Sequence, residues 1–229
     1  MDNVSRLPVC RECLASIGRI AEAVCCVCGE RLLSVYPQAG ETEQRCGECQ
    51  QSEWPFARAV AYGSYEGGLR DLIHLLKYQQ VRPAADVLGR MLAEAIADIV
   101  PAFGKQAPLL TPVPLHVVKL RQRGFNQSEL IARAAVRILS RTHFSFAEVG
   151  HPATEVLVRK RATESQTGLT RHQRRENMRG AFVVANAEAI AGRDVLLVDD
   201  VFTTGTTVSE CARVLRRAGA ERVWVATVD

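Results

Sequence analysis

Residues 194–207 read DVLLVDDVFTTGTT, and their pattern is the strongest indication of the fold in the sequence. Its four apolar residues, Val195 to Val198, are too few for a helix and rich in β-branching, which is typical of a strand buried on both faces of a parallel sheet. Apolar residues behind the loop recur at helical spacing as far as Gly219, which suits the position after a helix end. The stretch therefore predicts strand, loop and helix, with the loop at the carboxyl edge, where open α/β sheets bind ligands.

The chemistry of this loop favours a phosphorylated sugar. A helix N-terminus offers free N–H groups and a favourable dipole to phosphate, and glycine lets the backbone approach the anion. The amides offered here are those of Thr203, Thr204, Gly205, Thr206 and Thr207. Asp199 and Asp200 would repel a bare polyphosphate, but they can accept hydrogen bonds from ribose hydroxyls. No Gly-Lys-[Ser/Thr] motif is present, which excludes the P-loop of an ATPase.

The segment resembles the loop with which type I phosphoribosyltransferases bind 5-phosphoribosyl-1-pyrophosphate (PRPP). In that pattern, four apolar residues precede two acids, two or three spacers and Thr-Gly-[Gly/Thr]-Thr, and residues 195–207 match it without a gap. The alternative is an acidic turn before a threonine-capped helix, but such a turn does not need two acids and four threonines around one glycine. The resemblance implies that Asp199 and Asp200 hold the ribose hydroxyls and that the loop holds the 5-phosphate.

Composition and charge narrow the class of protein. At 229 residues, the chain can hold one good-sized domain and a small appendage. The sequence has no apolar run of the roughly 18 residues needed to span a membrane, so no membrane insertion is expected. The first 25 residues mix charges, proline and cysteine, which argues against a secretory signal and predicts a cytoplasmic protein. Residues 110–185 carry 13 Lys/Arg against 5 Asp/Glu, which implies an anionic ligand, either phosphates or nucleic acid.

Seven of the eight cysteines lie in the first 49 residues, and six of them form pairs. The pairs are Cys10-x2-Cys13, Cys25-x2-Cys28 and Cys46-x2-Cys49, with Cys26 inside the second. In a reducing compartment such pairs are typical of zinc ligands. Residues 1–56 also lack the apolar periodicity of a core, so we expect that they need a bound metal ion to fold. We favour Cys25, Cys28, Cys46 and Cys49 as one structural Zn²⁺ site, with the alternative that Cys10 and Cys13 serve in place of another pair.

From residue 57 onward, strands and helices alternate. We predict strands at 57–65, 109–110, 156–158, 181–184, 195–198 and 222–228, with helices after Gly67-Gly68, at 84–100, around 130–139 and around 208–218. Residues 111–114 should form a loop, because their two prolines cannot sit in a central strand. Lys77 and Tyr78 are expected at the surface. The alternation predicts a doubly wound parallel α/β sheet in residues 57–229, preceded by the cysteine-rich module of residues 1–56.

Two further segments are basic. Lys119, Arg121 and Arg123 precede a predicted helix, which suits a pyrophosphate, although a solvated basic loop is the alternative. Residues 159–179 hold seven Lys/Arg and few apolar residues, so we predict a mobile flap that cannot pack. Its Arg171, Arg174 and Arg175 could close on PRPP or track a nucleic-acid strand.

Nearly the whole chain resembles the ComF family of competence-type proteins, which includes the GntX-like proteins. The matching motifs are the paired cysteines, Leu75-Leu76-Lys77-Tyr78, Thr111-Pro112-Val113-Pro114-Leu115, Arg123-Gly124-Phe125-Asn126-Gln127, Gln166-Thr167-Gly168-Leu169, Arg175-Glu176-Asn177, Gly180-Ala181-Phe182 and the acidic loop after Val198. The resemblance implies a zinc-ribbon-like module joined to a type I phosphoribosyltransferase domain, with a link to the handling of incoming DNA. Longer members begin with a further cysteine pair, and we expect this chain to start after it.

An active member of this family would bind PRPP with a Mg²⁺ ion carried mostly by the substrate. The resemblance implies catalytic roles for Asp199, Asp200 and Arg123, with Arg121 and Arg123 neutralising the leaving pyrophosphate. Three hypotheses follow. The chain is a PRPP-binding transferase with an unidentified acceptor, or a protein that handles single-stranded DNA with other competence proteins and keeps a regulatory or vestigial PRPP site, or a structural interaction module.

Overall fold

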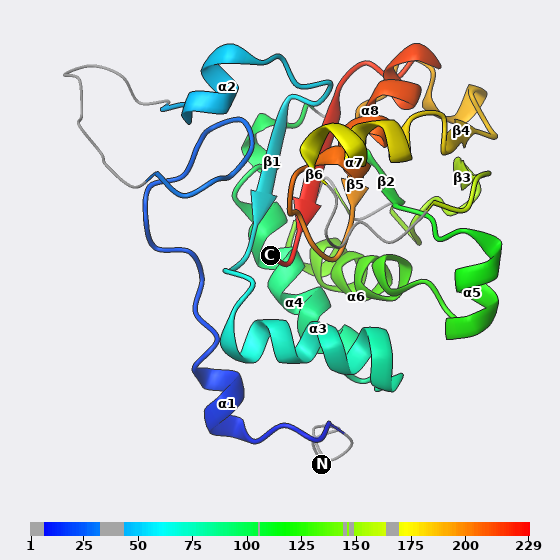
Figure 1. Ribbon diagram of the computed structural model, residues 1–229. Coiled ribbons are helices and arrows are strands. Elements are labelled where there is room, and N and C mark those ends of the chain that lie inside the picture. The colour runs from blue at the N-terminus through cyan, green and yellow to red at the C-terminus, as the bar shows by residue number, and fades with distance from the viewer. Residues whose placement is uncertain (1–6, 33–43, 105, 144–145, 147–148, 164–169) are drawn as a thin grey trace.

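The computed structural model describes residues 7–32, 44–104, 106–143, 146, 149–163 and 170–229. At the centre of this described part is a parallel sheet of four strands in the order β1-β6-β5-β2 (Figure 1). The strands are β1 (Arg58–Ala61), β6 (Val223–Thr227), β5 (Val195–Val198) and β2 (Leu109–Pro112). Val195 of β5 is in register with Val223 of β6 and with Leu109 of β2, so β5 has a neighbour on each side, as predicted.

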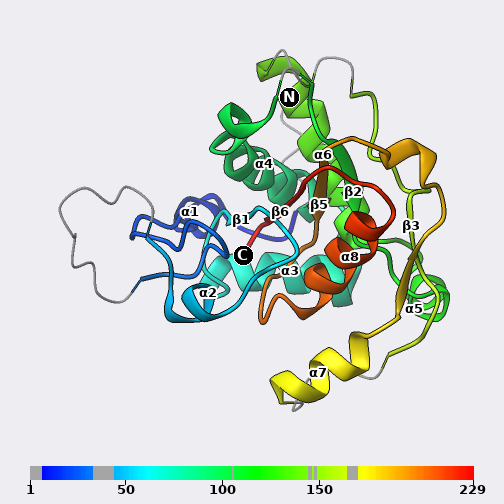
Figure 2. The same ribbon diagram turned by 90° about the horizontal axis from the view of Figure 1, so that it is seen from above.

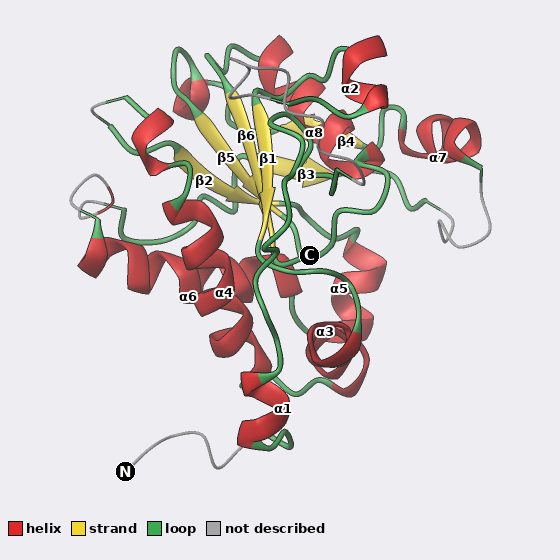
Figure 3. Cartoon of the chain, turned by 90° about the vertical axis from the view of Figure 1, so that its left-hand side faces the viewer, coloured by secondary structure: helices red, strands yellow, loops and turns green. Residues whose placement is uncertain are grey.

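Helices cover both faces of this sheet (Figure 3). The main ones are α3 (Gly67–Gln79), α4 (Ala84–Ala97), α6 (Gln127–Thr142) and α8 (Thr206–Arg217). Along β5, Leu196 and Val198 pack into the cluster formed with α3, α4 and α6, whereas Val195 and Leu197 pack into the cluster formed with α8. The predicted doubly wound parallel α/β sheet is therefore confirmed. None of the described helices is both long and apolar enough to cross a lipid bilayer.

The prediction that residues 111–114 form only a loop is wrong at its first two positions. Strand β2 continues to Pro112, which is in register with Val198 of β5. The reason is that β2 is an edge strand of the described sheet, so proline's missing N–H removes no hydrogen bond from a central ladder. The N–H of Val113 then donates to the Val198 carbonyl at 2.8 Å and extends the contact by one residue.

The remaining elements connect the layers. They are α5 (Val117–Arg123), the antiparallel strands β3 (Leu157–Arg159) and β4 (Phe182–Val184), α7 (Arg171–Met178) and the 3-10 turns η2 (Val100–Ala102) and η4 (Glu188–Ile190). Helix α5 forms inside the segment that was expected to be a basic loop. Helix α7 lies at the periphery of the fold, at the end of the β3–β4 connection (Figure 2).

The prediction that residues 159–179 cannot pack is wrong for their second half. A capping box between Thr170 and Gln173 begins α7, and Met178 at its end is fully buried. The N–H of Gly180 donates to Oε1 of Glu210 at 2.8 Å, which attaches this segment to α8. The Gln166-Thr167-Gly168-Leu169 motif lies outside the described residues.

The cysteine-rich segment is attached to the free edge of the sheet. It contains the short helices α1 (Arg11–Ala15) and α2 (Gly47–Gln51) and a turn closed by the bridge between Val24 and Arg31. Within that turn, the Val27 carbonyl accepts a hydrogen bond of 2.7 Å from the N–H of Ala59 in β1. The module therefore caps an edge strand whose backbone would otherwise be open. The boundary at residue 56 stays a prediction.

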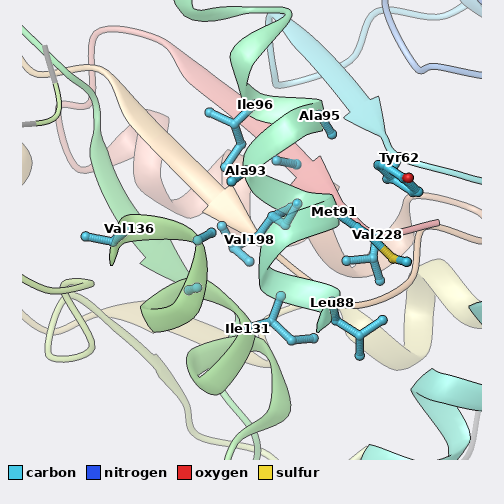
Figure 4. Close-up of a cluster of buried hydrophobic side chains, with 14 of the residues drawn as sticks. Tyr62, Leu88, Met91, Ala93, Ala95, Ile96, Ile131, Val136, Val198 and Val228 are labelled. Carbon is cyan, nitrogen blue, oxygen red and sulfur yellow. The ribbon is translucent and has the colours of Figure 1, made fainter. Parts of the chain in front are cut away.

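The crossing of α4 and α6 requires a glycine. Figure 4 shows Leu88 of α4 and Ile131 of α6 among the buried side chains around Val198 of β5. A Cβ at Gly89 would lie 2.3 Å from the Cβ of Ala134 and 2.9 Å from the Ile131 carbonyl oxygen. The two helices therefore approach closely only because residue 89 has no side chain.

Gly89→Ala is expected to lower the melting temperature although alanine favours helices. Helix propensity alone would stabilise α4 by about 1 kcal/mol, whereas overpacking typically costs about 1–3 kcal/mol. Gly104→Ala is the control, because a Cβ there meets nothing within 4 Å. Differential scanning calorimetry of the two variants tests this, and a Gly89→Ala protein as stable as wild type would contradict the close crossing.

Candidate functional site

Two acidic side chains leave β5 at its carboxyl end. The N–H of Asp199 donates to the Ala226 carbonyl at 3.2 Å, so this residue is still held by β6. Its Oδ1 accepts hydrogen bonds from Oγ of Ser128 in α6 at 2.9 Å and from the N–H of Asp200 at 3.0 Å. The acidic pair is thus held where β5, β6 and α6 meet.

Lys77 supplies the countercharge, which corrects the expectation that it lies at the surface. Its Nζ is 2.8 Å from Oδ2 of Asp200, and the two side chains are only 15% and 6% exposed. Tyr78 is 66% exposed, as expected. The missed signal was the helical phase, because Lys77 follows the buried Ile73 by four residues and so shares its inward face.

Burial and charge set the protonation of this pair. Burial, followed by the charge of Asp200, raises the pKa of Asp199 to about 7. Burial acts to lower the pKa of Lys77, but the Asp200 carboxylate outweighs it and the net pKa is raised. Near neutral pH, the site therefore holds an ion pair beside a carboxyl group close to half protonation. Such a group can accept hydrogen bonds from hydroxyls or, once protonated, donate one.

The threonine-rich loop leads directly into α8. Gly205 has a φ of +64°, in the left-handed region that favours glycine, and α8 begins at Thr206. The Oγ1 atoms of Thr204 and Thr206 are 2.9 Å apart. Thr203 is exposed and Thr207 half-buried. Since N–H groups in the first turn of a helix have no acceptor within it, this geometry suits an anion in front of α8.

Arg121 and Arg123, the predicted pyrophosphate ligands, lie in the last turn of α5. Gly124 ends this helix with a φ of +75°. The guanidinium of Arg123 lies over the Tyr78 ring, 5.6 Å from its centroid. Arg123 therefore contacts the end of α3 that also carries Lys77. Arg121 is exposed.

Asp229 is a further member of this edge that the sequence did not reveal. Its Oδ1 accepts a hydrogen bond of 2.7 Å from the N–H of Phe202, which fixes the backbone between Asp200 and Gly205. Burial, with a smaller contribution from the charge of Asp200, raises the pKa of Asp229 to about 7. No local motif surrounds this residue, and only the end of β6 brings it to the loop.

Four cysteines converge in the N-terminal module. Their Sγ atoms all lie within 4.8 Å of one another, and the residues are Cys25, Cys28, Cys46 and Cys49. The turn that holds the first pair is tight, because the N–H of Gly29 donates to the Cys25 carbonyl at 3.0 Å and Gly29 has a φ of +75°. The second pair lies at the start of α2. Cys10 and Cys13 are exposed at α1 and are not part of this group.

The thiols of this cluster fit a bound cation. Burial raises the pKa of Cys49 to about 12 and that of Cys28 above its usual range, because charged thiolates are poorly solvated here. Burial acts the same way on Cys25, but N–H groups of Cys28, Cys46 and Val27 outweigh it and lower its pKa to about 7. Four thiolates this close need a positive charge between them. Tetrahedral Zn²⁺ with Zn–S distances of about 2.3 Å suits four sulfur ligands, and the 3.6 Å between Sγ of Cys28 and Cys46 fits that arrangement.

The chain is similar to known proteins over most of its length. Residues 128–228 match the family model described as phosphoribosyl transferase domain. The chain is 33% identical over 210 residues to the DNA utilization protein YhgH of Escherichia coli K12, covering 88% of each protein. It is 29% identical over 225 residues to competence protein F of Haemophilus influenzae, covering 94% of each. It is 24% identical over 211 residues to competence protein ComFC of Bacillus subtilis, covering 92% of this chain and 79% of that protein.

The parallel sheet, the acidic pair at its edge and the match of residues 128–228 to the family model define the chain as a phosphoribosyltransferase-domain protein. The extent of the similarity to full-length relatives shows more: the chain belongs to the family of YhgH and ComF competence and DNA utilization proteins, as its motifs predicted. A solved structure titled "structure of the allosteric regulatory enzyme of purine biosynthesis" aligns with 65% of this chain and 26% of its own, with 22% identity and a TM-score of 0.35.

The cysteine geometry predicts about one zinc ion per chain. Cys25→Ser is expected to lose this ion, because it removes one of four converging ligands, whereas Cys10→Ser keeps it. Metal analysis of the purified proteins by mass spectrometry measures both. Equal zinc content in the two variants would contradict the assignment of Cys25. Loss of zinc in Cys10→Ser would instead indicate that Cys10 and Cys13 are zinc ligands.

The raised pKa of Asp199 predicts a pH-dependent stability difference. Because the folded-state pKa of about 7 lies above the ordinary value of 3.8, the stability contributed by the protonated carboxyl is fully present below about pH 4 and is lost progressively as the pH rises to about 7. Asp199→Asn keeps an Oδ1 acceptor without the charge. The difference between its melting temperature and that of wild type should grow by a few °C in favour of the variant between about pH 5 and about pH 8. Asp71→Asn, a change on the exposed side of α3, is the control, and a difference independent of pH would contradict the assignment.

Proposed function

We propose that the chain binds PRPP together with Mg²⁺ at the carboxyl edge of its sheet. One observation carries the proposal: the half-buried Asp199 and the buried Asp200 follow β5 in the loop that leads, through a left-handed glycine, into α8. The observation supports the proposal because the two carboxylates can accept hydrogen bonds from hydroxyl groups and a helix N-terminus suits a phosphate. A ribose 5-phosphate unit presents both groups in one small molecule.

Each group at this edge has a role in that proposal. Asp199 and Asp200 accept hydrogen bonds from the ribose hydroxyls, and the residue 203–207 loop binds the 5-phosphate. Lys77 forms an ion pair with Asp200 and compensates part of the negative charge that the ligand brings. Arg123, in the last turn of α5 and over Tyr78 of α3, neutralises the pyrophosphate, and Arg121 adds positive charge from the same turn.

Mg²⁺ would enter with the ligand. Hard oxygen donors suit this ion, and carboxylates plus substrate phosphates are its usual ligands. Asp199 and Asp200 lie between the end of β5 and the proposed phosphate loop, so they could hold an ion that arrives on PRPP. When bound, the ion would neutralise the pyrophosphate as it leaves.

The biological role that we propose is DNA utilization in the cytoplasm, in contact with single-stranded DNA and other competence proteins. The names of the relatives support the process. The basic excess of residues 110–185 and the arginines of α7 support a polyanionic partner. The thiol cluster supports a reducing compartment, since all cysteines of the described structure are free.

Isothermal titration of the zinc-loaded protein with PRPP and Mg²⁺ tests the binding proposal. Wild type should bind PRPP more tightly than ribose 5-phosphate, which lacks the pyrophosphate, or AMP. Asp199→Asn with Asp200→Asn should weaken PRPP binding at least about tenfold, the effect of losing one hydrogen bond to a charged group. Asp71→Asn is the matched control, and circular dichroism checks the fold. Unchanged affinity in the double variant would remove the ribose role.

Pyrophosphate release separates a transferase from a protein that only senses PRPP. A transferase releases pyrophosphate when PRPP and pooled nucleobases are present together, and a regulatory site does not. A regulatory site instead predicts that PRPP changes the affinity for single-stranded DNA, measured by fluorescence anisotropy.

A further inference from the structure

Trp54 connects two sites that lie far apart in the sequence. It follows α2, which carries Cys49, and its ring belongs to an aromatic group with Phe56 and Phe202. The ring centroids are 5.2 Å apart for Trp54 and Phe56, 6.3 Å for Trp54 and Phe202, and 6.2 Å for Phe56 and Phe202. Phe202 is part of the loop that leads from the acidic pair to α8.

The Trp54 ring lies directly against the proposed phosphate loop. A Cβ added to Gly205 would lie 2.7 Å from Cζ3 of Trp54 and 2.7 Å from Cζ of Phe202. Gly205 therefore needs to be glycine for two reasons, its positive φ and the absence of space. The two rings form a wall that holds the backbone just before the first turn of α8.

The same two rings pack against the cysteine cluster. Trp54 and Phe202 lie against the buried side chains of Cys25, Cys28 and Cys49. The turn with the first two cysteines is fixed to the sheet by the hydrogen bond between the Ala59 N–H and the Val27 carbonyl. A bound metal ion would hold the sulfur atoms together and so keep one side of the aromatic wall in place.

We propose that Trp54 is a positioning residue that couples the four-thiolate centre to the phosphate loop. With metal bound, the cluster supports the Trp54 and Phe202 rings, and these hold the Gly205 backbone in the left-handed conformation that aims the α8 amides at an anion. Without metal, the cluster loosens and the loop loses its wall. The inference rests on the proposed function, because it assigns PRPP's 5-phosphate to this loop.

The coupling itself can be measured without ligand. The chain has two tryptophans, so Trp224→Phe leaves Trp54 as the only one. In this variant, zinc removal with a chelator should shift the Trp54 emission, and hydrogen exchange of the amides of residues 201–207 should become faster. Zinc added back should reverse both changes. Unchanged emission and unchanged exchange in the metal-free protein would overturn the coupling.

The effect on ligand binding is tested with variants of Trp54 that keep the metal. Trp54→Ala should retain zinc but bind PRPP at least about tenfold more weakly, as expected when a charge-assisted hydrogen bond is misplaced. Trp54→Phe should restore most of the affinity, because a phenyl ring can still fill the wall. Trp224→Phe is the matched control. Equal PRPP affinity in Trp54→Ala and wild type, at equal zinc content, would overturn the positioning role.

Failure of the proposed function gives a different result. If wild type binds neither PRPP nor ribose 5-phosphate, the proposed function fails, and the metal-dependent emission and exchange of residues 201–207 still decide whether Trp54 couples the two sites. If wild type binds PRPP and the loop exchanges equally with and without zinc, the proposed function stands and the coupling is wrong.

Discussion

Two adjacent carboxylates at the end of a fully buried strand are the constraint on which the edge of this sheet depends. Such charges are costly to remove from water unless they find partners. Lys77 of α3 pairs with Asp200, and Ser128 of α6 donates to Asp199. Helices from two parts of the chain must therefore end or begin at the same point. The acidic pair thus helps to fix the positions of α3 and α6 relative to β5.

The N-terminal module is built around cysteine thiols rather than around a large apolar core. It has little apolar side-chain surface, and its buried centre consists of Cys25, Cys28 and Cys49, with Trp54 and Phe202 packed against it. A segment this small usually needs a metal or disulfides in place of a core. The module also covers the edge of the sheet at β1 through Ala59, where unpaired backbone groups would otherwise be open to pairing.

Both features meet at the loop between β5 and α8. The acidic pair and Asp229 hold its first part, and the aromatic wall holds Gly205. The loop is therefore shaped by elements from the N-terminus, the centre and the end of the chain. The conformation of this loop of threonine and glycine therefore depends on contacts with residues distant in the sequence.

The local elements and the chemical character of the sites could be predicted from the amino-acid sequence alone. The apolar run of β5, the apolar spacing of α8 and the cysteine pairs are local patterns, and local patterns report which face or side of an element is buried. Only the tertiary structure decided which residues meet. In the folded chain, Pro112 belongs to an edge strand and Lys77 forms an ion pair with Asp200. Asp229 accepts a hydrogen bond from Phe202, and Trp54 packs against Gly205. These contacts join residues distant along the chain, and such pairings depend on how the packed layers cross, which no single segment encodes.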